Sequence, residues 1–512
     1  KLHIATLTGE GNLTVGSSRE KHEVAIADIS AYDGTFTVRG GNSTLALNLG
    51  ADEVLNSSRV TKDSDSALLL NGQGTYSLES LENVGADFSL ASQVQFGDSW
   101  SGTLKLKNGT AAGLEWNDFA AAGKVTVNGM SGWFDYFNPA DIHIQLEGAG
   151  MTVLDSSKKT YKYQKGISGS GDFVVQSKSA YESWYEMRGD MEAWRGAFRV
   201  LQSAKSENAA TVNLTLNGGG ILFDGSEGSG VYLERTGTLN VTIGHADTAS
   251  VLKGDIRNVG MTDGETTTFG SLNVTLNHEV EVQGDIQATS MKIGAGADIR
   301  TSGMVQATRC ELAGGKLLHH GQNIMFGSMD VSADSVLEIV ERAGNNGLAA
   351  KVCTIESLNL NAALNQIITG KCTLEIDTLT GSGPLAIQSR NEKHNVTIND
   401  ISGYTGNISL SSANTTLALN LGKDVVLDSA RVTKDDDSSL LLKGTGSYNI
   451  GTAREIAAGV SFAEDWQGSV RLTGTLAGDT LSSLSDEDSW VELYGVSGYL
   501  SRADATAGEQ TY

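Results

Sequence analysis

The amino-acid sequence predicts an all-β solenoid, in which the chain winds into stacked coils of short strands. Three observations lead to this prediction. The 512 residues include 62 glycines and only 2 prolines, apolar and polar residues alternate over short stretches, and one long segment occurs twice. Glycine without proline suits short strands joined by tight turns, because glycine accepts positive φ angles and proline would remove a donor from the strand ladder.

The predicted strands are about 4 to 7 residues long and alternate with period two. Glycine, asparagine, aspartate or serine ends most of them, as in "SLNVTLN". Only "SAYESWYEM" and "SLSDEDSWVELYG" are ambiguous between helix and strand. Helices therefore contribute little to the expected fold.

The charge and composition exclude several classes of protein. The formal net charge is -24 and the sequence pI is about 4.7, so the surface as a whole repels nucleic-acid phosphate and anionic lipid. No run of about 18 apolar residues is present, so no membrane-spanning segment is expected. Three cysteines are too few for a disulfide scaffold, whereas 39% hydrophobic residues are enough for a core.

An internal duplication sets the expected organisation. Lys21–Tyr76 aligns without gaps to Lys393–Tyr448, with 34 of 56 positions identical, and the match resumes at "SWSGTLKL" and "DWQGSVRL". A diverged third copy begins at "ISGSGDFVV", which is comparable to "LTGEGNLTV" and "LTGSGPLAI" in the other two. No linker separates the copies. We therefore expect one continuous solenoid over 1–512, with repeat copies at about 7–150, 167–243 (diverged) and 379–512 and a less regular segment at 244–378.

One short motif recurs five times in these copies. It consists of an aromatic residue, any residue, glycine, and then two apolar residues separated by one position. Coils of a parallel solenoid stack about 4.8 Å apart, so we expect the apolar pair to point into the core, the glycine to permit the bend into the strand and the aromatic ring to cover the corner. The motif begins at Tyr32–Gly34, Trp100–Gly102, Trp194–Gly196, Tyr404–Gly406 and Trp466–Gly468.

The longest versions of this motif, "YDGTFTVRGGNSTLAL" and "YTGNISLSSANTTLAL", resemble the autotransporter-associated β-strand repeat of large bacterial surface proteins. The resemblance implies a single-stranded right-handed parallel β-helix that is secreted through an outer-membrane barrel. It implies no cofactor. Such a protein is expected to carry a C-terminal outer-membrane barrel and a secretion signal, and neither pattern occurs in these 512 residues.

The search for catalytic and metal-binding patterns gives no site. Ser99 in "GDSW" is the one serine in a protease-like context, but the equivalent position in the second copy is Asp465 and the tryptophan motif already explains the stretch. The acidic runs "KDSDS" at Lys62 and "KDDDS" at Lys434 are either solvated turns or calcium ligands. His319 and His320 are adjacent and would face opposite sides of a strand. We therefore predict no catalytic, cofactor-binding or metal-binding residue.

Two further features leave alternatives open. Cys353 and Cys372 occur in matching contexts, "CTIE" and "CTLE", so they would stack as a disulfide or as an unpaired ladder if their separation equals one coil. An aromatic cluster in "GWFDYF" differs most between the copies and is the candidate ligand-contact site; its members are Trp133, Phe134, Tyr136 and Phe137.

These observations predict a monomeric, non-enzymatic protein that is secreted or held at the cell surface (outer membrane), as an adhesin or a structural display stalk. A host glycan or a surface protein is the expected partner, and nucleic acid is not. The alternative is a polysaccharide-active β-helix enzyme, either a lyase or a glycoside hydrolase, whose site would break the repeat, most naturally within 244–378.

Overall fold

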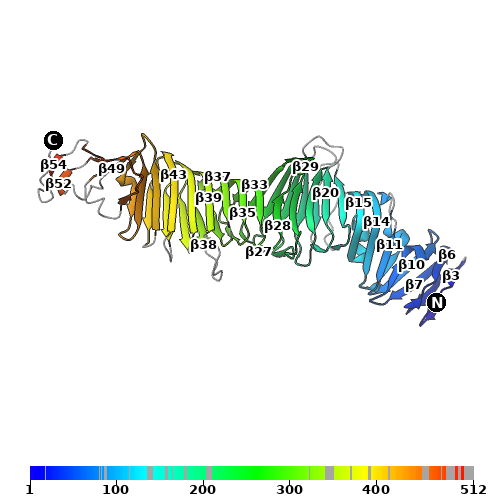
Figure 1. Cartoon of the computed structure of the whole chain (residues 1–512). Helices are drawn as coiled ribbons and strands as arrows, with labels where there is room; N and C mark the ends of the chain where they lie inside the picture. Colours follow the sequence, from blue (N-terminus) through cyan, green and yellow to red (C-terminus); the bar gives the residue numbers. More distant parts are fainter. Residues whose placement is uncertain are drawn as a thin grey trace. The chain divides into compact units, whose positions relative to one another are not determined.

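The computed structural model describes the whole chain apart from residues 18, 80, 82–83, 86–88, 115, 135–141, 156–159, 164, 178–181, 203–209, 322, 341–350, 370–371, 390–393, 413–414, 452–459, 474, 480–489, 494–496 and 501–512. Contacts between residues divide the chain into two compact units, Lys1–Asn273 (unit 1) and Val274–Tyr512 (unit 2). Each unit is a stack of coils built from parallel strands (Figure 1).

The described residues confirm the all-β prediction and form a parallel β-solenoid. The helical exceptions among them are one four-residue α-helix, α1 (Leu90–Gln93), and the 3-10 helices η1 (Ser57–Arg59), η2 (Trp116–Ala122) and η3 (Ser429–Arg431). Both ambiguous stretches contain strands, Glu182–Met187 and Trp490–Leu493. The handedness of the coil stays a prediction. No helix in the described part of the chain is long and apolar enough to cross a membrane.

In unit 1 the first coils each supply strands to several sheets. The first sheet contains β1 (Leu2–Ile4), β4 (His22–Ile26), β7 (Ser43–Leu49), β10 (Ala67–Gly72) and β13 (Gln95–Trp100). Beside it lie β2 (Thr8–Gly9) with β5 (Ala31–Tyr32), and β3 (Asn12–Gly16) with β6 (Thr35–Arg39) and β9 (Val60–Lys62).

The long sheet of unit 1 follows the remaining coils. Its strands are β8 (Val54–Asn56), β11 (Thr75–Glu79), β12 (Val84–Gly85), β14 (Thr103–Leu114), β15 (Lys124–Phe134), β16 (His143–Leu146), β17 (Met151–Asp155), β18 (Thr160–Tyr163), β19 (Ile167–Gly169), β20 (Phe173–Ser177), β21 (Glu182–Met187), β22 (Ala197–Gln202), β23 (Thr211–Leu216), β25 (Gly230–Glu234), β26 (Thr238–Ile243), β28 (Asp255–Asn258) and β31 (Ser271–Leu276), the last of which carries the division between the units. Two smaller pairs are β24 (Gly220–Leu222) with β27 (Ser250–Leu252), and the antiparallel hairpin of β29 (Met261–Asp263) and β30 (Thr266–Thr268).

Unit 2 contains two long parallel runs and two shorter ones. The first run is β33 (Ile286–Ile293), β35 (Val305–Ala313), β37 (Ile324–Ala333), β39 (Lys351–Leu360), β41 (Cys372–Gly381), β43 (His394–Tyr404), β45 (Thr415–Leu421), β48 (Ser439–Gly444) and β50 (Val460–Phe462). The second run is β32 (Glu279–Val282), β34 (Asp298–Thr301), β36 (Lys316–His319), β38 (Ser335–Val340), β40 (Leu364–Thr369), β42 (Leu385–Ser389), β44 (Ile408–Ser411) and β47 (Val432–Lys434). The shorter runs are β46 (Val426–Asp428), β49 (Ser447–Ile450), β51 (Ser469–Leu472) and β53 (Trp490–Leu493), and β52 (Thr475–Asp479) with β54 (Ser497–Leu500).

The duplicated segments place the same side chains in the core of each unit. In unit 1 Val24, Leu45 and Leu68 stack in register, and in unit 2 Val396, Leu417 and Leu440 do the same. All six side chains are at most 4% exposed. A fully buried aliphatic side chain contributes about 1.5–3 kcal/mol, so each of these ladders stabilises the stacking of its coils.

Coil length is uneven. Met291, Cys310 and Met329 are successive register partners at a constant short interval, whereas the interval between the register partners Tyr185 and Leu214 is much longer. At the other two cysteines the interval between register partners is slightly longer than at Met291 and Cys310. The register partner of Cys353 is therefore Leu374, and that of Cys372 is Lys351. One coil at this place is therefore longer than the separation of Cys353 and Cys372, so the two cysteines do not stack on each other.

Candidate functional site

The repeated aromatic motif forms a corner between successive coils, and Tyr404 and Gly406 show its geometry. Tyr404 is 2% exposed, and its hydroxyl lies 2.9 Å from the carbonyl oxygen of Gly383 in the preceding coil and 2.8 Å from that of Asn407. Burial raises the pKa of Tyr404 to about 12. A Cβ atom on Gly406 would lie closer than 3.0 Å to the Gly383 oxygen and to the Tyr404 hydroxyl. The glycine is therefore required for close approach between coils, which differs from the bend expected from the sequence.

The other four copies repeat this arrangement. In each, the motif glycine lies against the carbonyl oxygen of a glycine in the preceding coil, with no room for a Cβ atom: Gly34 on Gly11, Gly102 on Gly74, Gly196 on Gly171 and Gly468 on Gly446. The motif tryptophan rings also lie against the motif glycine, but their indole nitrogens differ in partner: that of Trp194 donates to the carbonyl of Gly171 at 3.0 Å and that of Trp100 to the carbonyl of Ala122 at 3.2 Å. All ten motif residues thus serve the stacking of coils in this structure.

The corner depends on a second glycine motif in the preceding coil. Every one of the five corners rests on a Gly-x-Gly sequence whose first glycine has a φ angle between 89° and 106°. The residue after the aromatic donates its N–H to the carbonyl of that first glycine, at 2.7–2.9 Å. The first glycines are Gly9, Gly72, Gly169, Gly381 and Gly444.

An arginine in the following coil completes the two best-matched corners. In unit 2 the Arg431 guanidinium donates to the carbonyls of Tyr404 (2.8 Å) and Gly406 (2.9 Å) and lies 5.5 Å from the Tyr404 ring centroid. In unit 1 Arg59 makes the equivalent contacts with Tyr32 and Gly34. Both arginines belong to matching "SSR" and "SAR" segments of the duplicated sequence, and the sequence alone does not indicate their role.

Two further corners use a polar side chain where the motif has an aromatic one. Arg235 precedes Gly237 by two positions, is 1% exposed, and donates to the carbonyl of Ala210 at 3.3 Å; its burial lowers its pKa. His319 precedes Gly321 by two positions, is 0% exposed, and lies 2.8 Å from the Thr301 hydroxyl. The sequence search for aromatic residues missed both positions.

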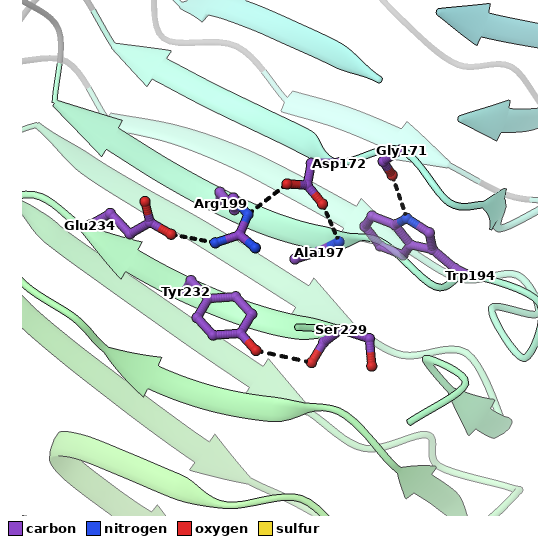
Figure 2. A network of polar contacts seen from close by, with 8 residues as sticks. All are labelled: Gly171, Asp172, Trp194, Ala197, Arg199, Ser229, Tyr232 and Glu234. Atoms are coloured by element: carbon purple, nitrogen blue, oxygen red, sulfur yellow. Dashed lines mark hydrogen bonds and ion pairs between the residues drawn. The ribbon is translucent and has the colours of Figure 1, made fainter. Parts of the chain in front are cut away.

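A charged network on the lateral face of unit 1 links three successive coils. Figure 2 shows Arg199 between Asp172 and Glu234, with the Tyr232 ring beside it. The Arg199 Nε donates to Asp172 Oδ2 at 2.6 Å, its Nη1 donates to Glu234 Oε1 at 2.5 Å, and its Cζ lies 4.7 Å from the Tyr232 centroid. Asp172 also accepts from the backbone N–H of Ala197 at 2.9 Å.

The charges in this network indicate a structural role, in which Arg199 holds neighbouring coils together. Burial acts to lower the pKa of Arg199, but the hydrogen bonds and charges of Asp172 and Glu234 outweigh it, so the pKa lies above its ordinary value. A general base needs a carboxylate oxygen that is free to accept a proton, and the Arg199 guanidinium is hydrogen-bonded to one oxygen of Asp172 and one of Glu234. Because the three side chains are about one-third exposed, each ion pair contributes on the order of 1 kcal/mol or less.

The acidic runs form matched turns. Asp435 accepts from the backbone N–H groups of Ser412, in the preceding coil, and of Ser438, and these hydrogen bonds lower its pKa. Asp63 accepts from Gly40 in the equivalent place in unit 1. No group of three or more His, Cys, Asp or Glu side chains suited to a metal ion occurs among the described residues.

The remaining candidates are placed as follows. Ser99 donates its hydroxyl to Asn71 Oδ1 at 2.9 Å. Trp133 and Phe134 end strand β15, opposite Ala112 and Leu114, but their side chains, and the whole of Tyr136 and Phe137, lie outside the described residues. Cys310 is buried between Met291 and Met329, which raises its pKa. Comparison with protein-family models, with curated proteins and with solved structures finds no match to this chain.

Proposed function

We propose that this chain is an autotransporter-type passenger, secreted or displayed at the cell surface, that acts as a non-enzymatic adhesin or as a structural display stalk. The observation that carries the proposal is the use of the repeated motif. All five copies of the sequence that resembles the autotransporter-associated repeat pack the same corner of a parallel β-solenoid, which is the fold that the resemblance implies.

The chemistry of the lateral surface supports a binding role. Outward-facing positions carry hydroxyl, amide and ion-paired side chains in register from coil to coil, as in the pairs Lys292–Glu311 and Asn213–Asn240. Such ladders present the same polar groups repeatedly on a framework held rigid by the core. A net charge of -24 favours neutral or basic partners over nucleic acid and sulfated polysaccharide.

The proposal is tested by display and adhesion. The chain is fused ahead of the translocator barrel of a well-characterised autotransporter, in place of its passenger. Antibody labelling of intact cells should detect it at the surface. Cells that display it should adhere to a glycan- or protein-coated surface more than cells that display an unrelated folded domain.

The competing enzyme class has its own readout. Purified protein is incubated with neutral and acidic polysaccharides, and chain length is followed by chromatography. We expect retention of some polysaccharides and no shortening of any. Shortening, or failure of the fused chain to reach the surface, would overturn the proposal.

A further inference from the structure

One exposed tryptophan is not used by the fold. Among the tryptophans whose side chains are described, Trp100, Trp194 and Trp466 occupy coil corners, but Trp184 points outward from strand β21 and is 36% exposed. Its register partners are Thr160 in the preceding coil and Asn213 in the next. Both are smaller than an indole, so the ring stands beside shorter side chains.

The strand that carries Trp184 is held rigidly. Its inward residues Ser183, Tyr185 and Met187 are at most 2% exposed. The Tyr185 ring stacks on Tyr161 with centroids 4.9 Å apart, and it meets the edges or faces of Phe173 and Phe198 at 5.8 and 5.6 Å. An aromatic platform that is already ordered loses little conformational entropy when it binds a ligand.

Polar groups surround the platform at fixed positions. Asn213 donates to Glu182 Oε1 at 2.9 Å and accepts from Asn240 at 2.8 Å, and Asn240 accepts from Asn273 at 2.9 Å. This amide ladder continues the column of Trp184 across three coils, at about 4.8 Å per coil. A column of threonines, Thr215 and Thr242, lies beside it.

A shallow hollow of about 280 Å³ lies against the indole. Thr160, Trp184, Tyr185, Glu186 and Thr215 line it. The Glu186 carboxylate already accepts from Arg188 and from Asn217 at 3.0 Å. We call the surface formed by Thr160, Trp184, Glu186, Asn213 and Thr215 the Trp184 face.

These features match one class of ligand. A pyranose ring has an apolar face of C–H groups that stacks on an aromatic ring, and hydroxyl groups at its rim that exchange hydrogen bonds with amides, hydroxyls and carboxylates. Phosphate or sulfate groups are disfavoured, because Glu182 and Glu186 flank the ring and the nearby cations Lys162 and Arg188 are both paired with Glu186.

We propose that the Trp184 face binds a neutral glycan chain, with one sugar ring stacked on Trp184 and the following sugars along the Asn213–Asn240–Asn273 ladder. This inference rests on the proposed function as a binding protein and names the class of partner and its site. Because the ladder extends the site beyond one ring, a hexasaccharide should bind at least tenfold more tightly than its monosaccharide.

Titrations of the whole chain test the proposal. The probes are cellohexaose, chitohexaose and mannohexaose, their monosaccharides, and a heparin hexasaccharide as the anionic comparison; the readouts are tryptophan fluorescence and calorimetry. We expect at least one neutral hexasaccharide to bind and to quench fluorescence. Trp184→Ala should weaken that binding at least tenfold, and Trp184→Phe should weaken it less.

Phe269→Ala is the matched control, because Phe269 is an aromatic residue of unit 1 that is 59% exposed and does not belong to the Trp184 face. It should leave binding unchanged, and far-UV circular dichroism should be the same for all variants. Absence of binding to every neutral hexasaccharide, equal binding by Trp184→Ala, or preference for heparin would overturn the inference. Adhesion of displaying cells that survives Trp184→Ala would refute this site alone, whereas shortening of the hexasaccharides would refute the non-enzymatic function.

Discussion

Replacing Gly406 by alanine should loosen one coil corner in unit 2. The added Cβ atom would lie closer than 3.0 Å to the Gly383 carbonyl oxygen and 2.6 Å from the Tyr404 hydroxyl, so the two coils must separate locally. This separation disturbs the hydrogen bonds from Tyr404 to Gly383 and from Arg431 to Gly406, both 2.9 Å long.

The expected loss follows from those contacts. A neutral hydrogen bond contributes about 1 kcal/mol and one from a charged donor about 1.5–3 kcal/mol, so Gly406→Ala should cost about 3 kcal/mol of local stability. That corresponds to a decrease of roughly 100-fold in amide protection at the corner. Native-state hydrogen exchange measures this decrease as the protection of the Thr405 amide, which donates to the carbonyl of Gly381 at 2.8 Å.

Gly422→Ala provides the control within the same unit. The nearest atom to its added Cβ would be Val425 Cγ2, at 3.7 Å, which is ordinary contact. This variant should change stability by less than about 0.5 kcal/mol. Equal protection of Thr405 in the two variants would refute the close-approach argument for the motif glycine.

Two further predictions concern a turn and a thiol. Hydrogen bonds lower the pKa of Asp435, so its contribution to stability is present above the unfolded pKa, near 3.9, and is lost as pH falls through the lower folded pKa. In Asp435→Asn the amide of Ser412 should therefore lose less protection from exchange on acidification than in the unaltered protein. An acid profile that is the same for both proteins would contradict this. Burial raises the pKa of Cys310, so iodoacetamide at pH 8 should label it only after denaturation, as read by peptide mass spectrometry; rapid labelling of the folded protein would show that the thiol is accessible.

Much of the coil was predictable from local sequence. The "TLALNLG" segments at 44–50 and 416–422 alternate with period two, and strands β7 and β45 bury Leu45 and Leu417 as that period requires. The Gly-x-Gly partner of three of the five corners was also visible, since "LTGEGNLTV", "ISGSGDFVV" and "LTGSGPLAI" begin the three copies. Its role was not, because the contact joins residues of successive coils that lie far apart along the chain.

The sequence pattern did not predict the corners at which a non-aromatic side chain or a histidine takes the position of the tyrosine or tryptophan. Arg235 and His319 take the place of the corner aromatic, and only the position of the following glycine against the preceding coil identifies them. The sequence directed attention to Trp133 and its neighbours, whereas the tryptophan that the structure places outward on a rigid strand is Trp184.

The sequence by itself determined that this chain forms stacked coils of short strands, because composition, period-two alternation and a long duplication each encode local geometry. Only the tertiary structure decided which residues meet. The interval between register partners is short at Met291 and Cys310 and much longer at Tyr185 and Leu214, so a fixed period misaligns side chains within one or two coils. That is why Cys353 faces Leu374 rather than Cys372. Partners across coils depend on register, and register depends on every loop between them.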